Sequence, residues 1–408
     1  MPHNLRILTL SCTFPNPLQD KLGLFVLSRI LRLADSASVM VVAPVAVIEY
    51  GNAGRRRMDW TCFPVQTRDS VEIYHPRWIY PPLLGVLNAL FLFAQTGRLV
   101  RKLLRSRKID IIDSHFAYPD GIVAAMFATV FRVPFSITLR GNEPMHAQFY
   151  FRGLAIRWAI RRATAVIAVS RRLADFAVSC GASPDRVSVI PNGVDVAVFH
   201  PRSTAGTREA LGLSNASRII LSAGYLIERK GHDKVIRCLR ELRLRGLDAE
   251  LVIAGGTGGE GNAEPALHRL VQELDVASHV HFTGAVPPSK LAELMSVADV
   301  VCLASSREGW PNVVNEALAC GAPVVATDIG GVPDMLPSEE YGIVVPVEDW
   351  QQLADALRRA LEKPWDRARI AAWGAARSWE QVGIEVYEAL SNAVQRHDEI
   401  YQGEEAVP

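Results

Sequence analysis

Long apolar runs, paired cysteines and low-complexity segments are all missing from this sequence. The longest largely apolar stretch, residues 83–94, is too short to span a bilayer as a helix. The six cysteines are scattered without a C-x-x-C pair, so we expect reduced thiols rather than a disulfide framework or a zinc site. The first apolar strand pattern, residues 5–10, follows no signal-peptide pattern. These absences predict a cytoplasmic protein.

The formal net charge of +1 at pH 7 hides an uneven distribution of charge. Residues 1–195 contain 24 Lys and Arg against 13 Asp and Glu, whereas the rest of the chain has 20 against 30. A basic first half favours an anionic partner, such as a phosphorylated lipid or the inner face of the cell membrane. The charges are interspersed without an aromatic-rich basic motif, which argues against nucleic acid. The residues expected to touch lipid headgroups, unless they are merely solvated helix faces, are those of 98–108 with Arg152, Arg157, Arg161 and Arg162.

Short apolar runs alternate with helical periodicity twice along the chain, which predicts an α/β fold with two parallel sheets. The predicted strands of the first half are residues 5–10, 39–43, 71–74, 109–113, 135–139, 165–169 and 187–190. Its predicted helices are residues 22–34, 84–107, 119–131, 152–162 and 171–180. The predicted strands of the second half are residues 218–223, 250–254, 279–283, 299–303, 323–327 and 343–346.

The boundaries follow from breaks in these two patterns. Residues 44–70 fit neither period and include three adjacent arginines, so we interpret them as a long surface loop. Turn-rich and polar residues place the interdomain linker near 192–216. We therefore expect domains at 1–195 and 196–370, followed by one long helix over 371–395.

One stretch in the second half, residues 304–323, combines a helix start with two carboxylates. Asn312 follows a proline and favours a helix start, and Gly321 with a nearby proline favours its end. Glu308 precedes this helix and Glu316 lies on it. The free N–H groups of such a helix face the carboxyl ends of the strands, where anionic ligands bind in open α/β sheets. The two carboxylates suit the hydroxyl groups of a phosphorylated ligand; the plainer alternative is an ordinary βαβ unit with two solvated Glu side chains.

Glu308, seven residues and Glu316, followed by Ala-Leu-Ala-Cys-Gly-Ala-Pro and by the Gly330-Gly331 pair, resemble the donor-site signature of family 4 retaining glycosyltransferases. The resemblance covers nearly the whole chain and is more specific in the second half. It implies the GT-B fold, in which two Rossmann-like domains face each other across a cleft. In that family the first domain binds the acceptor, the second binds the donor, and the final helix packs back onto the first domain. The type implied is that of bacterial surface-polysaccharide or teichuronic-acid biosynthesis.

Further family motifs follow three strands of the first half. Gly23 lies in the loop after the first strand, where the family often has two glycines and this chain has Leu22 in place of one. His115, at a strand end before Pro119 and Gly121, matches the family's histidine motif, which implies a role beside the donor sugar. Arg140 matches the basic residue before a glycine at the next strand end. Each also has a purely structural interpretation. Gly23 would only allow a turn, His115 would only be a histidine with its hydrogen bonds made within the fold, and Arg140 would only be a buried arginine.

The phosphate-binding motif of the family lies after the first strand of the second half. Lys230 before a glycine supplies positive charge for a diphosphate, and Gly224 precedes it in the same loop. The family's usual arginine is replaced here by Tyr225, so we expect Arg229 to provide the second cation. The remaining donor contacts implied by the resemblance are Gly255, Gly309, Val313 and Asn312.

The resemblance implies a retaining transfer of a hexose from a UDP- or GDP-sugar to a glycan or polyprenyl-diphosphate-linked acceptor. Catalytic roles fall to His115, Lys230, Arg229 and Glu308, and Glu316 would hold the ribose. No cofactor is expected, and because no Asp-x-Asp triplet is present, no metal ion either. Two alternatives stay open: another GT-B nucleotide-sugar enzyme, such as an epimerase or phosphorylase, and a non-catalytic Rossmann-type nucleotide-binding protein.

Overall fold

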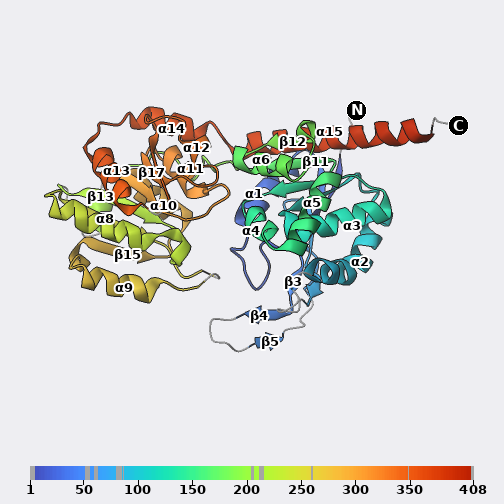
Figure 1. The fold of residues 1–408 in the computed structure, drawn as a ribbon, viewed down its shortest axis with the longest axis horizontal. Coiled ribbons are helices and arrows are strands. Elements are labelled where there is room, and N and C mark those ends of the chain that lie inside the picture. The colour runs from blue at the N-terminus through green and yellow to red at the C-terminus, as the bar shows by residue number, and fades with distance from the viewer. Residues whose placement is uncertain are drawn as a thin grey trace. The chain divides into compact units, whose positions relative to one another are not determined.

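The computed structural model describes residues 5–50, 56–58, 63–79, 85, 87–203, 206–210, 216–258, 261–347 and 349–405. The chain divides into two compact units, each built around its own sheet (Figure 1). Unit 1 comprises Met1–Asn192 and Trp379–Pro408, and unit 2 comprises Gly193–Ser378. The last helix of the chain therefore belongs to the unit with which the chain begins.

The sheet of unit 1 has eight strands, which are parallel except at one edge. Its central strands are buried along nearly their whole length because helices cover both faces. In spatial order the strands are β12 (Val187–Val189), β11 (Ala165–Ala168), β10 (Phe135–Leu139), β9 (Ile111–His115), β1 (Arg6–Leu10), β2 (Ser38–Val42), β7 (Val71–Tyr74) and β6 (Gln66–Arg68). Two short pairs lie outside it, β3 (Val45–Ala46) with β8 (Arg77–Trp78) and β4 (Ile48–Tyr50) with β5 (Arg56–Met58).

The helices of unit 1 lie between these strands in sequence. They are α1 (Leu24–Leu33), α2 (Asn88–Arg107), α3 (Ile122–Phe131), α4 (Glu143–Ala147), α5 (Tyr150–Arg162), α6 (Arg171–Ser179) and α15 (Trp379–Glu405). Helix α15, red in Figure 1, packs against α1. Val382, Val386 and Leu390 share a buried cluster with Val26 and Ile30. This apolar stripe at helical spacing ties the C-terminal segment to unit 1.

The sheet of unit 2 has six parallel strands. Neighbouring residues of one strand enter different cores, since Leu221 lies in one buried cluster and Ile220 in the other. In spatial order the strands are β15 (Val280–Gly284), β14 (Ala249–Ala254), β13 (Arg218–Ala223), β16 (Val300–Leu303), β17 (Val324–Thr327) and β18 (Gly342–Val345). The helices are α7 (Thr207–Ala210), α8 (His232–Leu244), α9 (Glu264–Glu273), α10 (Pro288–Val297), α11 (Asn312–Ala319), α12 (Val332–Met335), α13 (Trp350–Glu362) and α14 (Arg367–Ala375).

Each sheet has one point where the direction of chain progression reverses. In unit 1 the strands proceed outward from β1 to β7 on one side and from β9 to β12 on the other, so the reversal lies between β1 and β9. In unit 2 it lies between β13 and β16 by the same reasoning. Loops that leave the carboxyl ends of the two strands at such a point diverge and leave room for a ligand. The strand order thus selects four loops, two in each unit, as candidate ligand-binding segments.

Three predictions about the elements need correction. The strand predicted at 109–113 runs over Ile111–His115, because its polar end is buried and hydrogen-bonded within the sheet. The loop predicted at 44–70 contains the short strands β3 to β6, although residues 51–55 and 59–62 lie outside the described part. The single helix predicted over 371–395 is two helices, α14 in unit 2 and α15 in unit 1. Parts of the predicted helix 84–107 and of the linker 192–216 also lie outside the described residues.

Candidate functional site

The loops after β13 and β16 bring two cations and one carboxylate together. Lys230 Nζ donates to Glu308 Oε1 at 2.6 Å, and Arg229 Nη1 donates to the same oxygen at 3.1 Å. Arg229 Nη1 also donates to the backbone carbonyl of Arg307 at 3.0 Å. The three side chains of this triad are only 13–22% exposed, so water screens their charges weakly. Two positive groups therefore face one point at the reversal of the sheet.

Backbone contacts fix the loops that carry this triad. Ser306 N donates to the carbonyl of Arg229 at 2.9 Å, which joins the two loops directly. Gly231 has a φ of +68°, and a Cβ there would overlap the carbonyl oxygen of Ala304. Gly331 N donates to the carbonyl of Gly309 at 2.9 Å, so the Gly330-Gly331 turn supports the loop that holds Glu308. The triad is thus preorganised by the surrounding main chain.

Helix α11 begins immediately after this loop. Pro311 precedes it and supplies no capping side chain, and Asn312 and Val313 are its first two residues, both partly buried. The helix N-terminus adds partial positive charge beside the triad. Burial raises the pKa of Glu316 to about 7, and the charge of Lys230 offsets part of this rise. Glu316 therefore lies close enough to Lys230 for their charges to interact.

Glycines after β13 and β14 allow two loops of unit 2 to pass in close contact. A Cβ at Gly255 would overlap the carbonyl oxygen of Gly224, and one at Gly224 would contact the Lys230 side chain at 3.4 Å.

Tyr225, at the position of the family's arginine, is 49% exposed. His232 is buried and fully engaged, with Ser222 Oγ 2.8 Å from its Nδ1 and the Tyr225 carbonyl 3.2 Å from its Nε2. Arg229, and neither Tyr225 nor His232, therefore provides the positive charge beside Lys230.

In unit 1, the predicted residues His115 and Arg140 lie in one buried polar network. Arg140 Nη2 lies 2.8 Å from His115 Nδ1, and His115 Nε2 lies 3.2 Å from Asp113 Oδ2. Burial lowers the pKa of His115 to about 3, with a further contribution from the charge of Arg140, so the imidazole is neutral near pH 7. The side chain of His115 is fully buried, so in this conformation it orients its neighbours. Its direct role beside a donor sugar stays a prediction.

The rest of this network lies between β9, β10 and the neighbouring helices. Arg29 donates to Thr138 Oγ1 at 2.7 Å, and Arg140 Nη1 donates to Asn192 Oδ1 at 2.9 Å. Glu143 accepts the backbone N–H groups of Arg140 and Gly141 at 2.9 and 2.7 Å. Arg140 alone among these residues was a predicted site residue, because hydropathy does not distinguish a buried polar group from an exposed one.

Gly23 ends the loop that follows β1. Its φ is +66°, and a Cβ would overlap the carbonyl oxygen of Thr13. Glycine is therefore required here by the local structure, because the loop folds back against its own first residues before α1 begins. That return brings the beginning of the loop over the carboxyl end of β9.

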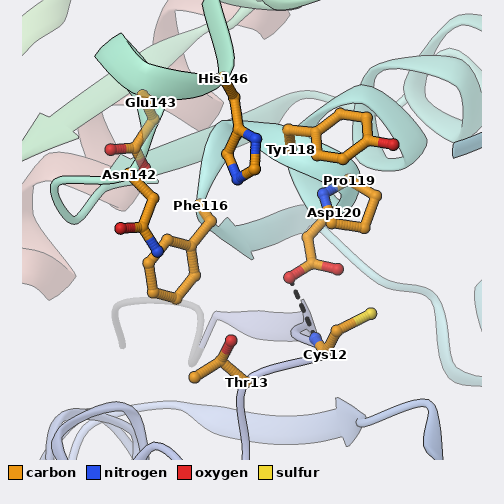
Figure 2. Close-up of a pocket in the computed structure, with 9 residues that line it drawn as sticks. All are labelled: Cys12, Thr13, Phe116, Tyr118, Pro119, Asp120, Asn142, Glu143 and His146. Atoms are coloured by element: carbon orange, nitrogen blue, oxygen red, sulfur yellow. Dashed lines mark hydrogen bonds between the residues drawn. The ribbon is translucent and has the colours of Figure 1, made fainter. Parts of the chain in front are cut away.

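A cavity of about 170 Å³ lies at the reversal point of unit 1 (Figure 2). Its lining comes from the segments that follow β1, β9 and β10, the last of which includes α4: Cys12, Thr13, Phe116, Tyr118, Pro119, Asp120, Asn142, Glu143 and His146. Asp120 is 1% exposed and accepts the backbone N–H of Cys12 on Oδ2 at 3.0 Å. Asp120 was not among the predicted site residues, although it follows β9 and directly precedes a glycine.

In the described part of the chain, no group of three or more His, Cys, Asp and Glu side chains is arranged to hold a metal ion. Within the same residues, no helix is both long and apolar enough to cross a membrane.

Two family models match this chain, one in each half. Residues 204–377 match the family described as glycosyl transferases group 1. Residues 46–198 match the family described as Glycosyltransferase Family 4. The first match contains the triad and α11, and the second contains His115, Arg140 and the cavity lining except Cys12 and Thr13.

Similar sequences and structures agree with these matches. A putative teichuronic acid biosynthesis glycosyltransferase of Bacillus subtilis is 27% identical over 87% of this chain and 89% of its own length. A D-inositol 3-phosphate glycosyltransferase of Stackebrandtia nassauensis is 35% identical over 53% of this chain, and the match spans about half of that relative. HepE of Anabaena in complex with UDP has a TM-score of 0.72 at 20% identity, over 95% of this chain and all of that one. Sucrose-phosphate synthase of Thermosynechococcus elongatus has a TM-score of 0.68 at 20% identity, over 99% and 100%. The α/β fold of GT-B type predicted from the sequence is confirmed.

Proposed function

Because this chain belongs to the family 4 glycosyltransferases, we propose that it transfers a hexose from a UDP- or GDP-sugar to a glycan or lipid-linked acceptor. Unit 2 binds the donor and unit 1 the acceptor. The transfer retains the anomeric configuration and uses neither a metal ion nor a cofactor. The proposal rests chiefly on one observation, the convergence of Lys230 and Arg229 on Glu308 beside the start of α11.

The reaction requires stabilisation of a leaving diphosphate. Negative charge develops on the bridging oxygen as the bond from the sugar carbon to the phosphate breaks. Lys230, Arg229 and the N-terminus of α11 are fixed in advance, so they stabilise this charge without first reorganising. When a donor binds, its phosphate oxygens take hydrogen bonds from the two cations, and the carboxylate of Glu308 is released toward the sugar hydroxyls.

The two carboxylates have different roles in this proposal. Glu308 stabilises the positive character that the sugar ring gains in the transition state. Glu316 accepts hydrogen bonds from the ribose hydroxyls, which it contacts equally before and during the reaction. Its position on α11, one residue into the second turn, separates it from the loop that carries Glu308.

The proposed acceptor is a growing polysaccharide on a polyprenyl diphosphate, by analogy with the relative from Bacillus subtilis whose name assigns it to teichuronic acid biosynthesis. Peripheral contact with an anionic membrane is part of the same proposal. Helix α5 and the residue before it expose large apolar side chains, and exposed basic side chains extend from the same helix. The apolar set is Phe149, Tyr150, Phe151 and Leu154, and the basic set is Arg157, Arg161 and Arg162.

Thermal unfolding with UDP, GDP and ADP tests the donor assignment, since a ligand that binds only the folded protein raises its melting temperature. We expect one diphosphate to stabilise the wild-type protein and to lose its effect in Lys230→Ala. Stabilisation by none of the three would refute the donor assignment. A nucleotide-sugar epimerase would also bind a nucleoside diphosphate, whereas a phosphorylase uses inorganic phosphate. Net transfer of sugar from a nucleotide sugar to an added acceptor excludes both.

A further inference from the structure

We propose that the cavity of unit 1 binds one neutral sugar ring of the acceptor and that Asp120 selects it by pairing with a ring hydroxyl. This inference rests on the proposed function, because it identifies the chemistry of the acceptor. The cavity lies at the reversal point of its sheet, where strand order alone predicts a ligand. At about 170 Å³ it is smaller than the roughly 300–1,000 Å³ of pockets for whole ligands, so it suits one ring of a longer molecule.

The lining combines aromatic faces with carboxyl and amide groups (Figure 2). Phe116, Tyr118 and His146 supply flat apolar surfaces, and Asp120 and Asn142 supply polar groups. A sugar ring has the same combination, since its C–H groups form an apolar face and its hydroxyls lie at the edge. Pockets for small ligands generally pair an apolar lining with a few placed polar groups.

Asp120 has one carboxyl oxygen that the protein leaves unsatisfied. Oδ2 accepts the N–H of Cys12 at 3.0 Å, whereas Oδ1 is buried without a hydrogen-bond partner. A buried polar atom without a partner is costly, and such atoms are often completed by a ligand. Burial raises the pKa of Asp120 to about 7, although the thiol and the N–H of Cys12 lower it. At pH 8, where binding is measured, the carboxylate is ionised and accepts only, so a ring hydroxyl donates a hydrogen bond to Oδ1.

The charge of the cavity excludes an anionic occupant. Two of its lining residues are acids, Asp120 and Glu143, and Glu143 is already satisfied by two backbone N–H groups. Arg152 lies over the Tyr118 ring, 5.1 Å from its centre, and none of the described lining residues is a lysine or an arginine. A phosphate group in this cavity would face carboxylates without a compensating positive group. A neutral hydroxylated ring avoids that repulsion.

The test uses Asp120→Asn, a substitution that reverses the polarity of the site. The backbone N–H of Cys12 will hold the amide oxygen, so the NH₂ group replaces Oδ1 and the acceptor is lost. The matched control is Asp175→Asn, the same change at an exposed position on α6 of the same unit. Asn142→Trp, which fills the cavity from an exposed position, replaces Asp120→Asn should that variant not fold.

The probes are the methyl glycosides of glucose, galactose, mannose and N-acetylglucosamine, with inorganic phosphate as the anionic probe. Binding to the full chain is measured by saturation-transfer NMR without donor. We expect one glycoside to bind the wild type and Asp175→Asn equally, and to bind Asp120→Asn roughly 10- to 100-fold more weakly. We also expect phosphate not to displace it.

Three outcomes would overturn the inference: no glycoside binds, Asp120→Asn binds as the wild type does, or phosphate displaces the glycoside. Stabilisation by nucleoside diphosphate, measured on the same variants, separates this inference from the donor assignment. If diphosphate binds every variant but Asp120→Asn leaves the glycoside unaffected, the subsite is wrong and the donor site stands. If a glycoside binds through Asp120 and no diphosphate binds, the donor assignment is wrong.

Discussion

Replacing either cation of the triad should slow sugar transfer without unfolding the protein. In the structure Lys230 Nζ lies 2.6 Å from Glu308 Oε1, and Arg229 Nη1 lies 3.1 Å from the same atom. Each cation then offers one preorganised donor to the leaving diphosphate. Loss of one such donor costs on the order of 10²- to 10³-fold in kcat, equivalent to about 2.7–4 kcal/mol.

The structure narrows this range for each residue. Lys230 is 14% exposed and donates to Glu308 at 2.6 Å, the shorter of the two contacts, so we expect Lys230→Ala to fall near the middle of the range. Arg229 is 22% exposed and shares its Nη1 with the Arg307 carbonyl, so we expect a loss of about 10²-fold. Both single variants leave Glu308 paired with the other cation, so no weakly solvated charge is left uncompensated and the protein should stay folded.

The assay is release of nucleoside diphosphate from the donor at saturating acceptor, with kcat and donor KM measured separately. Arg240→Ala, an exposed arginine on α8 of the same unit, is the matched control and should behave as the wild type. The double variant should lose less transition-state stabilisation than the sum of the two single losses in free energy, because the two cations share one partner. Folded single variants that both keep wild-type kcat would refute the phosphate site. If Arg229→Ala alone kept wild-type activity, Arg229 would not be the cation that replaces the family's arginine at position 225.

The other predictions concern separate parts of the molecule. Glu316→Gln should mainly raise the donor KM, whereas Glu308→Gln should lower kcat with little change in donor affinity; steady-state kinetics would contradict this split if both variants matched the wild type. Asp120→Asn should stabilise the protein increasingly as the pH rises, by up to about 4 kcal/mol above pH 7, measured by urea unfolding at pH 5 and pH 8 with Asp175→Asn as control. The sign follows because a folded-state pKa raised above 3.8 to about 7 favours the protonated carboxyl, so wild-type stability is lost as the pH rises through that range. An equal difference at both pH values would show that the pKa of Asp120 is not raised, and a pH dependence common to both proteins would belong to other groups that face the cavity, namely Cys12, Tyr118, Glu143 or His146. The protein should sediment with anionic vesicles at low salt and be released at high salt, at about 1 kcal/mol for each surface cation; no binding at low salt would remove the membrane from the proposal.

Strands with continuous apolar sequence were predictable to within one residue at each end. β10 at Phe135–Leu139 and β13 at Arg218–Ala223 have the predicted bounds, because apolar runs between turn residues describe a buried parallel strand completely. β9 was predicted two residues early because it ends in Asp113, Ser114 and His115. These polar residues are buried only because partners on neighbouring elements satisfy them, including Ser136 and Arg29.

More of the site in unit 2 than of the cavity in unit 1 could be predicted from the sequence. The spacing of Glu308 and Glu316 and the Lys230-Gly231 pair pointed to two loops, and the structure brings Arg229, Lys230 and Glu308 into contact. Asp120 could not be found in this way. Its burial depends on the loop after β1, which returns at Gly23 and places the N–H of Cys12 against the carboxylate. Such a contact joins residues 108 positions apart, and no local pattern encodes it.

Incorporation of labelled sugar tests the central claim most directly. The purified protein is incubated with the radiolabelled nucleotide sugar whose diphosphate stabilises it most, together with a bacterial lipid extract that contains polyprenyl-diphosphate-linked glycans. We predict that the label moves into the lipid-linked fraction with the wild type and with Arg240→Ala, and that Lys230→Ala reduces its rate by on the order of 10²- to 10³-fold. Release of nucleoside diphosphate, or conversion of the donor sugar, without any label in an acceptor would contradict the account.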